Sequence, residues 1–205
     1  MKAVVFDVDG VLTPFRSAWK RLHDILGVDA NLNRLLFERG YIDYVQWAVA
    51  DVALWRNVPR YIVEAAFKPR EGFDFMCSKL KEAGVLMIAL SAGVSYTRRL
   101  SFCFDEFLVN DVIYNGESVS DINVFVTNSN KAQLASEILS KHGVPLDETV
   151  AVGDSETDIP LLEEAGFSIA FNPTSRRVEE AADVVIRSNK LYLLTKYLLA
   201  ILKSR

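Results

Sequence analysis

Two aspartates, two residues apart, follow the first hydrophobic run of the chain. Asp7 and Asp9 lie at the end of a predicted strand over Ala3–Val8, and Gly10 comes next. Residues two apart in a strand point to the same side, and the ligand crevice of a parallel sheet lies beyond the carboxyl ends of its strands. Two carboxylates this close repel each other unless a cation or a shared proton compensates, and a hard divalent metal ion would do so. The alternative is two turn-forming residues after a strand.

A second acidic segment, GDSETD, follows the apolar run Thr149–Val152. Asp154 closes that run, where a carboxylate suits an oxygen-ligand shell around magnesium. Asp158 has a competing explanation, because it stands where a helix begins and could act as its cap.

Two further positions could bind an anion. Ser91 and Ala92 follow the predicted strand Val85–Leu90, and small residues let backbone N–H groups and a hydroxyl approach an anion at a helix N-terminus. The alternative for Ser91 is a plain helix cap. Lys131 opens a predicted helix that runs to about Lys141, where a cation opposes the helix dipole. A bound phosphate would explain that lysine, and a side chain pointing into water is the alternative.

Composition excludes several classes of function. The 205 residues are 50% hydrophobic and carry a net charge of −4 spread along the chain, which gives no footprint for a nucleic-acid backbone. No apolar stretch is long enough to cross a membrane and no leader-type segment opens the sequence, so we expect a soluble, cytoplasmic protein that acts on small molecules.

The histidines and cysteines offer no further chemistry. His23 and His142 belong to no cluster that could hold zinc. Cys77 and Cys103 stand in apolar surroundings without CxxC spacing, so we expect buried, reduced thiols and not a disulfide.

Apolar runs alternate with helical patterns, which predicts an α/β fold with a doubly covered parallel sheet. The further predicted strands are Phe167–Phe171 and Asp183–Ile186, and a helix is expected over Glu71–Ala83. Residues 15–68 show no strand pattern, only helical segments rich in Trp and Leu. A hairpin is expected around Asn115-Gly116.

Taken in order, DVDGV, Ser91, Lys131 and GDSETD resemble the four motifs of the haloacid dehalogenase-like phosphatase superfamily. The helical insert and the hairpin resemble its phosphoserine-phosphatase-like branch. The resemblance implies a Rossmann-like, doubly wound core over residues 1–14 and 69–205, with a small helical cap domain over residues 15–68.

That resemblance also implies roles for residues. Asp7 would be the nucleophile that forms an aspartyl-phosphate, and Asp9 the general acid and then base. Mg²⁺ would be held by the Asp7 carboxylate, the Asp9 backbone carbonyl and Asp154, while Asp158 would hold a metal-bound water or orient Lys131. Ser91, the Ala92 amide and Lys131 would bind the transferring phosphoryl group, and the substrate would be a small phosphorylated metabolite.

The chain departs from this branch where the substrate would bind. Phosphoserine phosphatases carry a glutamate shortly after the first motif, whereas this chain has Phe15-Arg16-Ser17 there. Arg16 would attract a second anion, with Arg56 or Arg60 as further contacts, or these arginines merely cover a solvated face.

Other readings of the same residues are a phosphotransferase that uses the same intermediate and a non-catalytic phospho-acceptor or binding protein. The sequence does not fix the oligomeric state.

Overall fold

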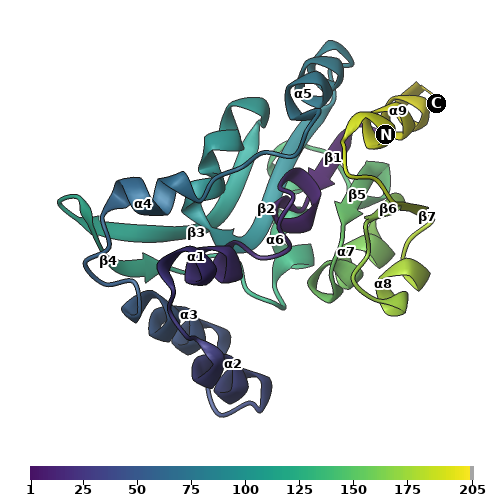
Figure 1. Cartoon of the computed structure of the whole chain (residues 1–205). Coiled ribbons are helices and arrows are strands. Elements are labelled where there is room, and N and C mark those ends of the chain that lie inside the picture. The colour runs from purple at the N-terminus through teal and green to yellow at the C-terminus, as the bar shows by residue number, and fades with distance from the viewer. Residues whose placement is uncertain (204–205) are drawn as a thin grey trace.

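The computed structural model describes residues 1–203, so residues 204 and 205, the end of the predicted core domain, lie outside it. A seven-stranded sheet runs through the molecule in the order β4-β3-β2-β1-β5-β6-β7 (Figure 1). The strands are β1 (Ala3–Phe6), β2 (Leu86–Val94), β3 (Glu106–Asn115), β4 (Ser118–Asn123), β5 (Thr149–Gly153), β6 (Phe167–Phe171) and β7 (Val184–Ile186). All neighbours are parallel except β3 and β4, which form an antiparallel hairpin. The predicted α/β fold is confirmed.

The helices are α1 (Ala18–Leu26), α2 (Asn31–Glu38), α3 (Tyr44–Ala53), α4 (Arg60–Ala65), α5 (Phe73–Glu82), α6 (Lys131–Lys141), α7 (Ile159–Glu164), α8 (Arg176–Glu180) and α9 (Tyr192–Lys203). Within residues 1–203 four further helical segments do not have regular α-helical geometry: η1 (Val8–Leu12), η2 (Ser95–Cys103), η3 (Leu146–Glu148) and η4 (Glu156–Asp158).

Alternation along β1 buries both of its faces. Val4 and Phe6 point into a core that α5 and α9 cover, whereas Ala3 and Val5 point into a core formed with α6 and α7. Successive side chains of a strand leave on opposite sides, so a strand this apolar needs a layer on each face. β1 therefore lies at the centre of the sheet, and its carboxyl end is held between β2 and β5.

Helices α1 to α4 lie between η1 and α5 and form the helical lobe of this molecule. They pack on a hydrophobic cluster of their own, centred on Trp19 and Trp55, which also takes in Tyr96 and residues of the hairpin. Figure 1 shows α2 and α3 at the far end of this lobe from α5. The expectation of helices without a strand in this region agrees with the structure, and its separation as a domain over residues 15–68 stays a prediction.

The prediction of reduced cysteines was wrong. Cys77 of α5 and Cys103 at the end of η2 form a disulfide with a Cα–Cα distance of 5.5 Å. Both residues are buried in the core on the α5 side, as their apolar surroundings indicated. The sequence did not show that this core brings two segments 26 residues apart into contact.

Two local predictions also need correction. Ser91 and Ala92 lie inside β2, which continues to Val94, and not at a helix N-terminus. Asn115 still pairs with Ser118, so Gly116 is the first of the two turn residues of the hairpin, with a φ of +58°. A glycine at that position is what a type II′ hairpin turn requires.

None of the described helices is long and apolar enough to span a bilayer.

Candidate active site

The carboxyl end of β1 places Asp7 and Asp9 in the interior. The Asp7 N–H donates to the Val152 carbonyl at 2.8 Å, so Asp7 extends the parallel register with β5. The chain then turns through η1, in which Asp9 and Gly10 leave helical geometry. Both carboxyl groups are buried, with residue exposures of 5% and 8%. Burial of two acids at one strand end is not what an ordinary exposed turn shows.

Lys131 is the cation between the two acidic segments. Its Nζ lies 2.6 Å from Asp7 Oδ1 and 2.5 Å from Asp158 Oδ1. The residue is only 3% exposed, so the alternative of a lysine pointing into water is wrong. The first turn of α6 thus brings a charge from residue 131 to the ends of β1 and β5.

Asp158 orients this lysine and also shapes its own loop. Its Oδ2 accepts hydrogen bonds from the backbone N–H of Asp154 and of Ser155, both at 3.0 Å. The Ser155 hydroxyl donates to the same oxygen at 3.0 Å. The side chain makes no capping bond to α7, but its bond to the Ser155 N–H belongs to the capping box of η4, the turn that leads into α7. Asp158 therefore has both the capping role and the contact with Lys131.

Asp154 meets Asp7 beyond the ends of neighbouring strands. Carboxylate oxygens of Asp7, Asp154 and Asp158 all lie within 4.8 Å of one another. Gly10, at a φ of +78°, lies against Asp154 so closely that an added Cβ would overlap its carboxylate. The glycine after the first acidic pair therefore makes room for the acid of the second.

Burial and mutual repulsion govern the ionisation of these acids. Burial raises the pKa of Asp7 to about 6 against the attraction of Lys131. Burial and then the charge of Asp7 raise the pKa of Asp9 to about 7, and the same two causes raise the pKa of Asp154 to about 9. Burial alone would lower the pKa of Lys131, but the charges of Asp158 and Asp7 raise it overall. One lysine does not compensate this many carboxylates.

The acidic cluster fits a divalent cation. Asp154 Oδ2 and Asp9 Oδ1 are buried and have no hydrogen-bond partner. Buried carboxylate oxygens without a partner are costly, and oxygen ligands on several elements are what a hard cation such as Mg²⁺ uses. A divalent ion between Asp7 and Asp154 would supply the charge that Lys131 does not.

Ser91 reaches the same site from β2. Its hydroxyl oxygen accepts the Gly93 N–H at 3.0 Å, and the residue is 2% exposed. That bond leaves the hydroxyl proton available to an anion. Ser91 and Ala92 line a cavity of about 250 Å³ together with Asp7, Asp154 and Lys131. The expected anion-binding residues are thus brought together, although on a strand.

The lobe is joined to this site by direct hydrogen bonds. The Ala18 N–H, at the start of α1, donates to Asp9 Oδ2 at 2.5 Å. The carbonyl oxygen of Ala92 accepts from Trp19 Nε1 at 3.0 Å and from Tyr44 Oη at 2.6 Å. Asn110 of β3 donates to the same carbonyl at 3.0 Å. Residues of α1 and α3 therefore cover the cavity on the side of the lobe.

The two candidate substrate arginines differ in position. Arg16 lines the cavity, on the segment between η1 and α1. Arg56 is exposed after α3 and is not among the residues that line it. Arg60 lies elsewhere, with its guanidinium 4.4 Å from the centre of the Tyr114 ring.

Arg70 is a structural residue of the site that the sequence did not reveal. It is 7% exposed and donates to three carbonyls of the η1 region: Gly10 at 2.6 Å, Val11 at 2.7 Å and Thr13 at 2.8 Å. These bonds hold the turn that carries Asp9. The only signal in the sequence was the Pro69 before it, which marks where the lobe ends.

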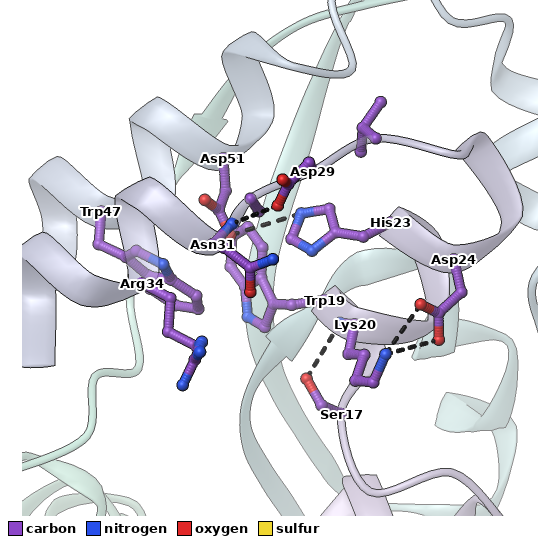
Figure 2. A pocket seen from close by; sticks show the side chains of 12 residues that line it. Ser17, Trp19, Lys20, His23, Asp24, Asp29, Asn31, Arg34, Trp47 and Asp51 are labelled. Atoms are coloured by element: carbon purple, nitrogen blue, oxygen red, sulfur yellow. Dashed lines mark hydrogen bonds and ion pairs between the residues drawn. The ribbon is translucent and has the colours of Figure 1, made fainter.

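A second cavity, of about 450 Å³, lies within the lobe (Figure 2). Trp19 and Trp47 line both cavities. His23 Nε2 lies 3.4 Å from the buried Asp51 Oδ2 at this second cavity. Both atoms are shielded from solvent and have no hydrogen-bond partner, although the two residues line this cavity.

Comparisons with known proteins agree with this geometry. A family model described as haloacid dehalogenase-like hydrolase matches residues 78–191. The phosphoserine phosphatase of Methanocaldococcus jannaschii is 27% identical over 96% of this chain and 97% of its own length. That of Archaeoglobus fulgidus is 30% identical over 93% of this chain, which spans 58% of that relative.

Among solved structures, a phospho-aspartyl intermediate analogue of phosphoserine phosphatase superimposes with a TM-score of 0.78 at 25% identity, covering 96% of this chain and 98% of the other.

Proposed function

Since the chain belongs to the haloacid dehalogenase-like hydrolase family, we propose that it hydrolyses the phosphate ester of a small metabolite, with Asp7 as nucleophile and Mg²⁺ as cofactor. The observation that carries the proposal is the buried contact of Lys131 with both Asp7 and Asp158, with Asp154 beside them. Three segments distant in the chain meet there, which carry Asp7, Lys131 and the pair of Asp154 and Asp158.

The positions of these side chains support the following reaction. An Asp7 carboxylate oxygen attacks phosphorus, the bond from phosphorus to the ester oxygen breaks, and Asp9 gives its proton to that oxygen. Asp9 then takes a proton from water, whose oxygen attacks the aspartyl-phosphate, so that phosphate leaves and the Asp7 carboxylate is restored. Lys131 and the Ser91 hydroxyl bind the phosphoryl oxygens through both steps.

The divalent ion would be held by carboxylate oxygens of Asp7 and Asp154, with the Asp9 carbonyl as a further ligand. When bound, it neutralises charge on the phosphoryl group and on the acids around it. Asp158 acts through Lys131, whose Nζ it holds at 2.5 Å.

The lobe shields the reacting groups. Asp9 is held by the first N–H of α1, and α1 and α3 cover the cavity. Exclusion of bulk water keeps Asp9 protonated and strengthens the attraction between Lys131 and the phosphoryl group. The division into a core and a cap domain, and a cytoplasmic location, are part of this proposal.

Release of phosphate from benzyl phosphate tests the function. We expect release that requires Mg²⁺, stops with chelator and is absent from Asp7→Asn. Asp24→Asn, a change at an exposed residue paired with Lys20 on α1, is the matched control and should retain activity. Equal phosphate release by Asp7→Asn and the unaltered protein would refute the proposal.

Product analysis separates hydrolysis from phosphoryl transfer. The relatives described above are named as phosphatases, which favours water as the acceptor. In the presence of glycerol we expect phosphate, and not glycerol phosphate, as the main product.

A further inference from the structure

Arg70 follows the helical lobe in the chain, yet its side chain is bound to the segment that precedes the lobe. The guanidinium donates to the carbonyls of Gly10, Val11 and Thr13. The backbone N–H of Arg70 donates to the carbonyl of Leu12 at 2.8 Å. One buried residue therefore holds four successive carbonyls of the segment that leads from β1 into the lobe.

This series of carbonyls begins directly after Asp9, whose own carbonyl Arg70 does not bind. Asp9 and Gly10 share a peptide group, and its N–H donates to the Phe15 carbonyl at 2.7 Å. A trans peptide directs its C=O and N–H to opposite sides, so the Asp9 carbonyl points away from Phe15. Arg70 fixes the next peptide group through the Gly10 carbonyl. The direction of the Asp9 carbonyl is thus set from both sides.

The chemistry of Arg70 suits the orientation of backbone groups. Its side-chain partners are backbone carbonyls and the ring of Phe171, whose centre lies 5.3 Å from the guanidinium carbon. Burying a cation among neutral groups is costly, but a planar fork of donors fixes several acceptors at once. A lysine, with one ammonium group on a flexible stem, could not hold three separate carbonyls in a fixed arrangement.

The positive charge of Arg70 acts in the opposite direction to this orienting effect. Burial lowers the pKa of Arg70, and the charge of Asp154 opposes that shift, so the guanidinium lies within the electrostatic range of this acid. A positive charge there would by itself weaken the binding of a cation to Asp154. Orientation and charge therefore predict opposite effects when Arg70 is replaced.

We propose that Arg70 is a positioning residue for the metal site: it fixes the turn after Asp9, aims the Asp9 carbonyl at the divalent ion and so strengthens Mg²⁺ binding. The inference rests on the proposed function and deepens it. Arg70 does not line the active-site cavity, so it acts through the backbone. Removal of a group that orients a metal ligand lowers metal affinity by roughly 10–100-fold.

Calorimetric titration of Mg²⁺ in the absence of substrate tests the proposal. Arg70→Lys keeps the positive charge and loses the fork of donors, whereas Arg70→Gln loses both. We expect the Kd for Mg²⁺ to rise roughly tenfold or more in both variants. The Mg²⁺ concentration for half-maximal phosphate release from benzyl phosphate should rise by the same factor, and kcat at saturating Mg²⁺ should change less.

Arg21→Gln is the matched control. Arg21 also donates to a backbone carbonyl, that of Ala66 at 2.9 Å, but this bond joins α1 to the end of α4 within the lobe. Its loss should leave the Kd for Mg²⁺ unchanged, even where it lowers the melting temperature. A residue that served only the stability of the fold would behave like Arg21, with a lower melting temperature and the Kd of the unaltered protein.

Three results would overturn the inference while leaving the phosphatase function in place. An unchanged Kd in Arg70→Lys would mean that the fork of donors does not set Mg²⁺ affinity. A lower Kd in Arg70→Gln would mean that charge near Asp154 outweighs orientation. An Arg70→Lys protein that does not fold would mean that the residue serves the fold as a whole. If the unaltered protein neither binds Mg²⁺ nor releases phosphate from benzyl phosphate, the proposed function itself fails.

Discussion

Two regions of this molecule bury carboxylates, and their partners differ. At the sheet edge formed by the carboxyl ends of the central strands, Asp7, Asp154 and Asp158 surround Lys131. In the lobe, Asp51 is just as buried but has only Asn33 as a hydrogen-bond partner and His23 at 3.4 Å (Figure 2). Burial alone therefore does not identify a reactive acid.

What separates the two regions is a buried cation. Both groups come from three places in the chain and lie beside a cavity, but Asp7, Asp154 and Asp158 have the buried Lys131 among them, whereas Asp51 has no lysine or arginine partner among residues 1–203. Burial raises the pKa of Asp51 to about 6 and lowers the pKa of His23, so it shifts both groups toward their neutral forms. The region around Asp7 and Lys131 is suited to proton and phosphoryl transfer, whereas Asp51 and His23 belong to the packing of the helical lobe.

The largest expected effect is on catalysis at the sheet edge. Asp7→Asn removes the attacking carboxylate while it keeps the shape of the side chain, so phosphate release should fall by about 10⁴-fold or more. Asp51→Asn should leave the rate within a few-fold of the unaltered protein, on the order of ordinary substitutions away from a site. A comparable loss in both variants would erase the distinction between the regions.

Removal of the buried cation should affect stability as well as rate. Lys131→Met leaves Asp7 and Asp158 without their partner, which costs about 3–5 kcal/mol of unfolding free energy. Urea denaturation measures the loss. Lys20→Met breaks an exposed pair with Asp24 and should cost less than about 1 kcal/mol. If added Mg²⁺ restored full stability to Lys131→Met, the lysine would not be needed for charge balance.

Gly10→Ala should damage the site through geometry. An alanine at this position would have to adopt the positive φ of Gly10, a strain of about 1–3 kcal/mol. Its Cβ would also overlap the Asp154 carboxylate. Gly84→Ala is the matched control, because Gly84 has a φ of +66° but open space around it. Both variants should melt earlier, and only Gly10→Ala should also lose phosphatase activity. Equal activity in the two would show that the approach of Gly10 to Asp154 is not required.

The smallest effect is expected in the lobe. The raised pKa of Asp51 means that the folded protein holds a proton more tightly than the unfolded chain, so stability falls as pH rises from about 4 to about 6. Asp51→Asn should remove this part of the pH dependence and raise the unfolding free energy at pH 7. Chemical denaturation at pH 4, 5, 6 and 7 measures both changes. A stability that fell in Asp51→Asn would mean that the ionised acid stabilises the lobe.

The central sheet and the sheet-edge residues were predictable because each follows an apolar run. The apolar runs locate β1 and β5, Asp7 and Asp154 follow their carboxyl ends, and neighbouring parallel strands bring those ends together. The position of Lys131 at the start of a helix was predictable, but its burial was not, because burial depends on where α6 lies relative to the sheet.

The features that the sequence missed all depend on contacts between distant segments. Nothing in the sequence around Arg70 indicates that its side chain binds three backbone carbonyls. Asn110 lies in the middle of a strand, where a polar residue is usually interpreted as facing solvent. Asn110 is fully buried and bonds to the backbone around Val126 as well as to Ala92. The Cys77–Cys103 disulfide was missed for the same reason, since spacing alone does not place α5 against η2.

The single carbonyl of Ala92 has a consequence for protein engineering. Side chains from α1, α3 and β3 all donate to it, so the lobe and the core share one acceptor. In a chimera whose lobe helices came from a relative, the Ala92 oxygen would lose its hydrogen bonds from the lobe unless the relative also had a tryptophan and a tyrosine at the positions of Trp19 and Tyr44. Recombination between such proteins should therefore succeed at junctions that keep these donors and the β2 segment from one parent.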